Sequence, residues 1–146
     1  MVLVEKLLAS KTQAIWQINP EASVYAALKL MAEKGIGALA VTQHTKLIGI
    51  LSERDYARKV ILENRNSNDT LVEDIMTRDV LYTFPKQTIE NCMVVMTKHH
   101  IRHLPVIEGD KLVGMITLGD VVKAIIEDQK IQINHLEQTI SWGESY

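Results

Sequence analysis

The stretch Leu47-Ile-Gly-Ile-Leu-Ser-Glu-Arg-Asp55 recurs 65 residues later as Leu112-Val-Gly-Met-Ile-Thr-Leu-Gly-Asp120. The same offset, without a gap, matches further pairs of identical residues on the N-terminal side of these stretches: Pro20 with Pro85, Met31 with Met96, Ile36 with Ile101, Leu39 with Leu104, and Val41 with Val106. Two unrelated helices can share an apolar period, but they do not also share proline, glycine and aspartate positions. The chain therefore contains a duplicated unit.

Each repeat predicts the order strand, helix, strand, strand, helix. The predicted strands are Ala14–Ile18, Ile36–Thr42 and Leu47–Leu51 in the first repeat, and Val80–Phe84, Ile101–Ile107 and Leu112–Ile116 in the second. Ser23 and Thr88 are the expected N-caps of the first helices, and the second helices begin at Ser52 and Thr117. The expected class is α/β (α+β), with two β-α-β-β-α units.

So small a sheet, with both helices on one face, leaves apolar surface uncovered, and the sister unit is the expected cover. We expect the two units to pack sheet-to-sheet with pseudo-two-fold symmetry. The predicted domains are residues 10–63 and 71–127, with a polar linker at 64–70 and a C-terminal amphipathic extension at 128–146. Residues 2–9 and 129–142 are predicted as amphipathic helices that lie outside the repeat.

Composition excludes several classes of protein. The 146 residues carry a net charge of −2, so a broad basic surface for nucleic acid is not expected. The charge is uneven: residues 1–65 hold 9 Lys/Arg against 6 Asp/Glu, whereas residues 66–146 hold 7 against 12. No apolar run approaches the roughly 18 residues of a membrane span. The N-terminus lacks the pattern of a secretory signal. We expect a cytoplasmic protein without a membrane partner.

The repeated chemistry is a glycine, two apolar residues, a hydroxyl residue and, three positions later, an aspartate. The hydroxyls of Ser52 and Thr117 fall where a strand passes into a helix, beside unpaired N–H groups that favour an anion. Asp55 and Asp120 lie in the same first turn, where a carboxylate can accept bonds from sugar hydroxyls. The same spacing is also close to a capping box, and duplication does not separate the two interpretations.

The region from about residue 10 to 127 resembles a tandem pair of CBS domains, the cystathionine-β-synthase-type module. The residues that carry the resemblance are the two motif stretches together with Ile75-Met-Thr-Arg-Asp-Val80 and Ile101-Arg-His-Leu-Pro-Val-Ile107. The resemblance implies that an adenosine nucleotide (AMP, ADP, ATP or an NAD-type dinucleotide) binds in the clefts between the repeats. It also implies that the aspartates hold the ribose, that the hydroxyls lie near ribose and phosphate, and that strand backbone brackets the adenine.

Spacing and resemblance together place the following residues at the ligand: Ile18, Gly37, Ala38, Ser52, Arg54, Asp55, Arg58, Thr77, Arg78, Thr83, Arg102, His103, Leu104, Pro105, Thr117 and Asp120. The two sites are not expected to be equal. Arg54 and Arg58 become Gly119 and Lys123 in the second repeat, whereas Arg102 and His103 replace Gly37 and Ala38 of the first. Arg54 and Arg58 could also form an ordinary solvated helix face.

Other chemistry is not indicated. His99, His100 and His103 lack the converging partners of a metal site, and Cys92 lies on an apolar helix face as a core residue. The sequence has no nucleophile elbow, phosphate-binding glycine loop or zinc motif, so no enzyme is predicted. The expected function is a regulatory sensor of energy or redox state that binds AMP, ATP or NAD/NADH. We expect it to be a homodimer with a regulated partner protein that the sequence does not identify. The alternative is a structural or adaptor homodimer with vestigial clefts.

Overall fold

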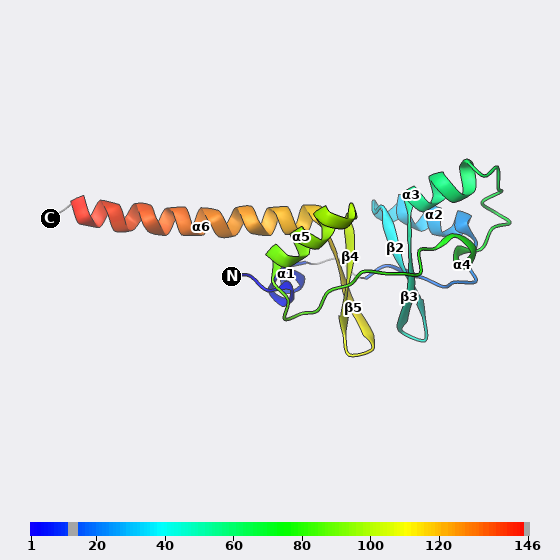
Figure 1. Ribbon diagram of the computed structural model, residues 1–146, viewed down its shortest axis with the longest axis horizontal. Coiled ribbons are helices and arrows are strands. Elements are labelled where there is room, and N and C mark those ends of the chain that lie inside the picture. Colours follow the sequence, from blue (N-terminus) through cyan, green and yellow to red (C-terminus); the bar gives the residue numbers. More distant parts are fainter. Residues whose placement is uncertain (12–14, 145–146) are drawn as a thin grey trace. The chain divides into compact units, whose positions relative to one another are not determined.

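The computed structural model describes residues 1–11 and 15–144, with side chains described up to residue 140. It is an α+β protein with two small sheets, which confirms the class expected from the sequence (Figure 1). In chain order the elements are α1 (Val4–Ser10), β1 (Gln17–Ile18), α2 (Val24–Lys34), β2 (Ala38–Gln43), β3 (Lys46–Ser52), α3 (Glu53–Tyr56), the π-helix η1 (Ala57–Ile61), α4 (Val72–Ile75), α5 (Ile89–His99), β4 (His103–Glu108), β5 (Lys111–Thr117) and α6 (Leu118–Glu144).

The chain divides into two compact units that are discontinuous in sequence. Unit 1 contains residues 1–12, 83–104 and 116–146, and unit 2 contains residues 13–82 and 105–115. These boundaries differ from the repeat boundaries in two ways: unit 1 contains α1 while unit 2 contains α4, and residues 105–115 of the second repeat are grouped with unit 2. The expected domain limits remain predictions.

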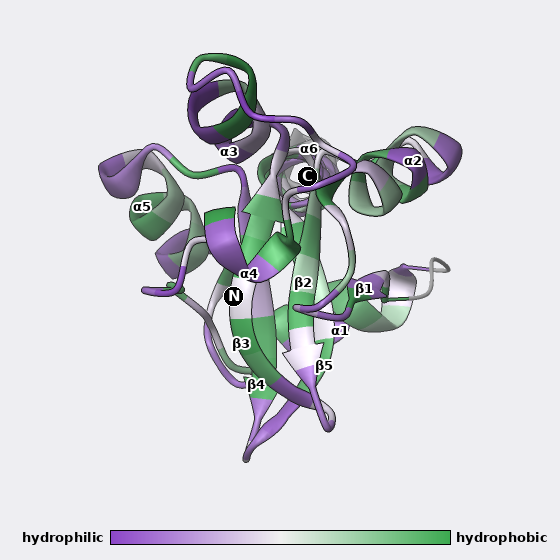
Figure 2. Cartoon of the chain, turned by 90° about the vertical axis from the view of Figure 1, so that its right-hand side faces the viewer, coloured by the Kyte–Doolittle hydropathy of each residue, from purple (hydrophilic) through white to green (hydrophobic). Residues whose placement is uncertain are grey.

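Unit 2 is built on a sheet of order β1-β2-β3. Strand β1 pairs with β2 in parallel and β2 pairs with β3 in antiparallel register, Val41 opposite Gly49. The β2–β3 turn places His44 and Thr45 at positive φ, as a two-residue type I′ hairpin requires. In Figure 2 the strands β2 and β3 carry hydrophobic colour along much of their length.

Helix α2 covers the core of this sheet. The Ser23 hydroxyl accepts a hydrogen bond from the Ala26 N–H at 3.1 Å, which confirms Ser23 as the N-cap. The helix ends at Gly35 in the left-handed conformation. Between these limits the helix buries Val24, Ala27 and Met31 against Leu39, Val41 and Leu51 of the sheet.

Unit 1 repeats this arrangement around α5. The Thr88 hydroxyl caps the helix by accepting from the Asn91 N–H at 3.2 Å. Ile89, Cys92 and Met96 are buried, and α5 packs against α6. Burial raises the pKa of the Cys92 thiol, although a hydrogen bond to the Thr83 hydroxyl works in the opposite direction. The prediction that Cys92 is a core residue is confirmed.

The predicted strand Val80–Phe84 is wrong. Only Thr83 in this segment forms a bridge, and the second sheet contains β4 and β5 alone. The reason lies at Pro105, which replaces Ala40 of the first repeat. The N–H and the carbonyl of Ile50 both bond to Thr77 and therefore point away from β2. Ala40 is paired with Ile50 in the sheet, so the N–H of Ala40 points away from β3 and toward β1. Proline has no N–H to donate there, and a third strand is disfavoured.

A short helix that we call the leading helix packs at the start of each repeat: α4 in unit 2 and α1 in unit 1. The prediction that residues 2–9 lie outside the repeat is therefore wrong. In unit 2 the N–H groups of Val72 and Glu73 donate to the carbonyls of Ala22 and Pro20, at 2.8 and 2.9 Å. In unit 1, Val4 and Glu5 make the matching bonds to Gln87 and Pro85 at the same distances. Helix α1 is therefore the counterpart of α4. It is hidden from the 65-residue register because it has 7 residues where α4 has 4.

The second helix of the second repeat does not end near residue 127. It continues into the predicted C-terminal helix, so that α6 forms one helix of 27 residues. No proline or glycine interrupts the sequence at the expected break, and Asp128, a possible N-cap, lies within the continuous helix. No helix among the described residues combines the length and the apolar character that crossing a membrane requires.

Gly49 shows why the motif begins with glycine. A Cβ atom there would lie 2.6 Å from the Met76 sulfur and 3.1 Å from the Thr77 carbonyl oxygen. We predict that Gly49→Ala lowers the free energy of unfolding by about 1–3 kcal/mol through overpacking. Gly119→Ala is the matched control, because a Cβ there meets nothing closer than 3.7 Å and alanine favours a helix. Denaturant unfolding compares the two variants; equal stabilities would contradict the prediction.

Candidate functional site

The repeated motif forms a reciprocal cap in unit 2. The Asp55 N–H donates to the Ser52 hydroxyl at 3.2 Å, and the Ser52 N–H donates to Asp55 Oδ2 at 3.0 Å. This is the capping box allowed by the spacing, and it fixes the first turn of α3 at the end of β3. The capping interpretation is confirmed, and any ligand role must coexist with it.

Asp55 is buried and both its oxygens are engaged. Oδ2 accepts from the N–H and the hydroxyl of Ser52, both at 3.0 Å. Oδ1 accepts from the Thr77 hydroxyl at 3.1 Å and forms an ion pair with Lys59 at 3.1 Å. Lys59 also donates to the Ile75 carbonyl at 2.9 Å. A carboxylate offers about four acceptor sites, so a sugar hydroxyl could bind Asp55 only by displacing one of these donors.

In unit 1 the matching aspartate is more accessible. The Thr117 N–H donates to Asp120 Oδ2 at 2.9 Å, and the Asp120 N–H donates to the Thr117 hydroxyl at 3.0 Å. Lys11 completes the set with an ion pair to the same oxygen at 2.7 Å. None of these bonds, which all come from residues that the structure describes, reaches Oδ1. The Asp120 side chain is 28% exposed, against 11% for Asp55.

These contacts shift the ionisation of Asp120. Partial burial works to raise the pKa of its carboxyl, but the hydrogen bonds from Lys11 and Thr117 and the charge of Lys11 outweigh burial. The pKa therefore lies below its ordinary value of 3.8. The group is a carboxylate at neutral pH, and as such it can accept hydrogen bonds but not donate them.

A second repeated contact places a side chain beside the start of α6. The N–H of Leu118 donates to the Arg102 carbonyl at 2.9 Å, just as the N–H of Glu53 donates to the Gly37 carbonyl at 3.0 Å in unit 2. The backbone geometry is shared, but only the second repeat has a side chain at this position. Arg102 thus brings a guanidinium to the end of the helix that also carries the positive pole of the helix dipole.

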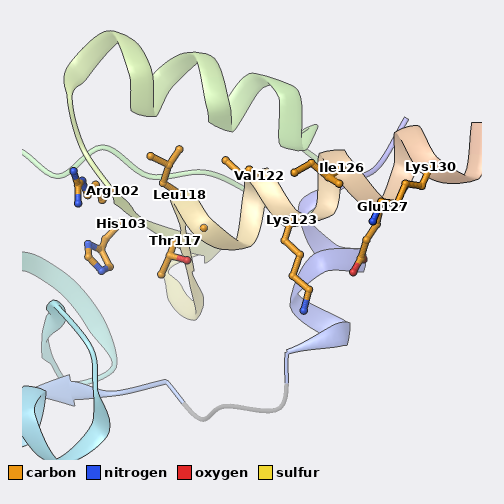
Figure 3. A pocket seen from close by; sticks show the side chains of 10 residues that line it. Arg102, His103, Thr117, Leu118, Val122, Lys123, Ile126, Glu127 and Lys130 are labelled. Carbon is orange, nitrogen blue, oxygen red and sulfur yellow. The ribbon is translucent and has the colours of Figure 1, made fainter.

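A groove in unit 1 begins at this point. It has a volume of about 730 Å³, within the range of small-molecule sites, and runs from the ends of β4 and β5 along α6. Figure 3 shows Arg102, His103 and Thr117 at one end and Lys130 at the other. Between them, Leu118, Val122 and Ile126 form an apolar wall, and Lys123 and Glu127 add charge. The groove therefore combines an apolar surface with cations at both ends and at Lys123 between them.

The structure distributes the sequence-predicted residues over the two units. Around Asp55 it gathers Ser52, Thr77 and the Gly37 backbone, and around the groove it gathers Arg102, His103 and Thr117, with Asp120 bonded to Thr117. Other predicted residues have other surroundings. Ala38 and Leu104 are core residues; Arg54 and Arg58 are exposed; Arg78 donates to the Glu73 carbonyl; Ile18 packs on the core; Pro105 is buried within β4; and Thr83 is buried beside Cys92.

Two functional cations were missed by the sequence analysis. Lys59 lies four residues after Asp55 on a predicted helix, a spacing that signals an ion pair and could have been used. Lys11 carries no local signal, because it lies 109 residues from Asp120 and only the fold brings them together. No group of three His, Cys, Asp or Glu side chains in the described part of the chain could hold a metal ion.

Comparison with known proteins was informative. The family model for the CBS domain matches residues 12–62 and 72–127. The chain is 37% identical over 126 residues to the CBS domain-containing protein CBSX3, mitochondrial, of Arabidopsis thaliana; the match covers 83% of this chain and 61% of that protein. The chain thus spans less than two thirds of the length of this relative.

Two solved structures are similar throughout the repeats. A CBS-domain protein of Burkholderia ambifaria MC40-6 is 49% identical, with a TM-score of 0.83, and the match covers 88% of this chain and 96% of that one. The CBS domain pair of protein MJ0100, in complex with 5′-methylthioadenosine and S-adenosyl-L-methionine, is 25% identical, with a TM-score of 0.76 and coverage of 87% and 98%.

The ion pair between Lys11 and Asp120 predicts a pH dependence. A depressed pKa in the folded state adds stability above the unfolded pKa, and this stability is lost as pH falls below 3.8 through the folded pKa. We predict by NMR titration that Asp120 ionises below pH 3.8 and that Lys11→Met shifts this transition upward. Lys86→Met is the control, since Lys86 pairs with Glu5 instead. An unchanged Asp120 titration in Lys11→Met would disprove the assignment.

Proposed function

This chain belongs to the CBS domain family, and on that basis we propose that it is a regulatory module that binds an adenosine nucleotide in the groove beside Thr117 and Asp120. The single observation that carries the proposal is the geometry at the start of α6. A partly exposed carboxylate with an unused oxygen, a guanidinium and an apolar groove meet there within one unit.

Each part of a nucleotide has a matching group in this arrangement. Oδ1 of Asp120 can accept bonds from the vicinal hydroxyls of a ribose, while Oδ2 keeps the helix cap and the ion pair with Lys11. The apolar wall of the groove suits the faces of a purine. Arg102 and Lys123 are placed for phosphate groups, and a guanidinium can bind a phosphate through two parallel hydrogen bonds.

The ligand class rests on the chemistry and on one relative. Protein MJ0100 was solved with two adenosyl compounds, so a relative with the same fold accepts adenosine-containing ligands. The cations of this groove favour ligands that also carry phosphate, namely AMP, ADP, ATP or an NAD-type dinucleotide. Arg102, His103, Thr117 and Asp120 are the residues on which we place the binding.

The first-repeat motif is proposed as a second, weaker site. Here Lys59 and Thr77 already occupy Oδ1 of Asp55, so a ribose would have to displace one of them. Lys59 is the easier to displace, because 43% of its side chain is exposed. Arg54 and Arg58 extend from the same helical segment and remain candidates for a phosphate at this site.

Regulation requires that the ligand bind two conformations with different affinity. Helix α6 carries the groove residues from Leu118 to Lys130 and continues to Glu144, so a ligand that changes its first turns can change the position of its far end. We propose that this helix reports the nucleotide to a partner protein and that the chain performs no catalysis of its own. The cytoplasmic location stays a prediction.

A structural or adaptor homodimer with vestigial clefts is the second candidate. The observation that favours it is the saturation of Asp55, whose bonds are all explained by capping and by the ion pair with Lys59. A thermal shift separates the candidates, because a ligand that binds only the folded state raises the melting temperature. Absence of any shift with AMP, ATP, NAD, 5′-methylthioadenosine or S-adenosyl-L-methionine at millimolar concentration favours the adaptor.

The central prediction concerns Asp120. Replacing it by alanine removes charged hydrogen bonds to the ribose, each worth roughly 1.5–3 kcal/mol, and weakens AMP or ATP binding by at least about tenfold. Asp55→Ala changes the affinity of the unit 1 site less than about threefold, since Asp55 belongs to the other unit. Calorimetric titration of the folded variants is the measurement.

Because Asp120 also caps α6, its removal lowers stability by about 0.5–2 kcal/mol whether or not a ligand binds. Circular dichroism therefore establishes first that each variant is folded at the titration temperature. Asp120→Asn provides a second variant that keeps an acceptor for the Thr117 N–H but loses the charge. Wild-type affinity in both folded variants would return Asp120 to a purely structural role.

A separate prediction tests the phosphate end of the groove. Arg102→Ala weakens ATP binding about five- to tenfold, with a smaller loss at high salt, and leaves adenosine binding unchanged. The fold tolerates a missing side chain here, because Gly37 occupies the matching position in the first repeat with the same backbone bond. Lys98→Ala, an exposed cation on α5, is the control. Equal losses for ATP and adenosine would contradict the assignment to phosphate.

A further inference from the structure

Between Gln129 and Ile140, helix α6 carries only exposed side chains. From Gln129 to Ile140 no side chain is buried or half-buried within the chain. This stretch nevertheless carries four large aliphatic residues, each more than half exposed: Ile131, Ile133, Leu136 and Ile140. A solvent-surrounded helix of this length is marginal in water, and clustered apolar side chains at that exposure mark an interaction surface.

The aliphatic residues follow a seven-residue period. Ile126, Ile133 and Ile140 are seven apart, and Gln129 and Leu136 lie three residues after the first two of them. These are the a and d positions of a heptad repeat, and we call these five residues the seam. A helix that docks on a globular surface carries a wider apolar stripe, whereas a stripe confined to the a and d positions is the narrower seam of a helix pair. Ile131 falls at position f, away from the seam.

The identity of the seam residues favours a second molecule of the same chain. Isoleucine at a with leucine at d is the pattern of parallel two-stranded coiled coils. Gln129 sits at a d position, where a parallel pair in register brings it against the partner's equivalent side chain and the two amides can hydrogen-bond to each other. A staggered or antiparallel arrangement would bury this amide against an aliphatic side chain, at the cost of an unsatisfied polar group.

The residues that flank the seam are compatible with the same pairing. The e and g positions hold Lys130, Gln132, Glu137 and Thr139. In a parallel dimer each g residue meets the e residue of the following heptad on the other helix, so Gln132 faces a glutamate and can donate to it. No like charges meet across the pair, and each helix end remains free to carry its own unit.

We propose that residues 126–140 of α6 form a parallel, in-register coiled coil with the same segment of a second molecule. The pairing is independent of the nucleotide proposal. Ile126 is shared by the seam and the far part of the groove, while Arg102, His103 and Thr117 lie at the opposite end and are not covered.

The first experiment compares two isoleucines of the same helix. At 10–100 µM the wild-type chain sediments as a dimer of twice 16.5 kDa. Ile133→Asp places a charge in the seam and raises the dissociation constant about a hundredfold or more, whereas Ile131→Asp at position f leaves the dimer intact. A monomeric wild type, a dimer that survives Ile133→Asp, or equal dissociation by both variants overturns the proposal. Circular dichroism verifies that both variants keep folded units.

A second experiment tests the register. Gln129→Cys places thiols opposite each other in the proposed dimer, so mild oxidation links it rapidly through a disulfide, while Ile131→Cys links at least about tenfold more slowly. Cys92 does not interfere because it is buried. Failure of Gln129→Cys to cross-link faster than Ile131→Cys overturns the parallel, in-register pairing, including a case in which a dimer forms through another face.

Discussion

The aspartate of each motif is held in place by the segment that leads into the other repeat. Asp55 accepts from Thr77 at 3.1 Å, and Asp120 is paired with Lys11 at 2.7 Å; Lys11 and Thr77 both lie in the residues that follow a leading helix. In the same exchange α1 bonds to the second repeat and α4 bonds to the first. Neither repeat can be completed from its own residues alone. A sheet of two or three strands has too small a core to be stable without such additions.

The exchange also explains why duplicated motifs became different sites. The capping bonds are the same in both repeats, so the strand-to-helix junction is preserved. The groups around it are not. In unit 2, Oδ1 of Asp55 is taken by Thr77 and Lys59. The residue whose carbonyl bonds to the start of α3 is Gly37, which has no side chain. In unit 1 no described residue bonds to Oδ1 of Asp120, and Arg102 stands at the position of Gly37. The same cap therefore leaves one carboxylate saturated and the other able to accept further bonds.

Helix α6 combines two kinds of surface in one continuous element. Its first turns pack on α5 and α1 and line the groove, and Val121 is fully buried. From Gln129 to Ile140 every side chain of the helix is exposed, yet the aliphatic residues continue with a seven-residue spacing. Because helical hydrogen bonds run unbroken between the two parts, a change at the groove and a change along the exposed half are mechanically connected. This is a structural basis on which a binding event could be communicated.

The sequence by itself determined the features that depend on local pattern. These include the 65-residue repeat, the caps at Ser23 and Thr88, and the burial of Cys92 on an apolar face. Each follows from residue type and short-range spacing, which survive in any tertiary arrangement. The ion pair of Asp55 and Lys59 also has a local signal, its i,i+4 spacing, but no prediction was drawn from it.

Only the tertiary structure decided which distant segments meet. The role of α1 as the counterpart of α4 was hidden by a difference of three residues in helix length. The pairing of Lys11 with Asp120 spans 109 residues and leaves no local trace. The loss of the strand predicted at Val80–Phe84 depends on which edge of β4 lacks an N–H at Pro105, and this is known only once the sheet register is known. Long-range pairing is a property of the folded chain, because backbone and side-chain partners are selected by packing and not by proximity in sequence.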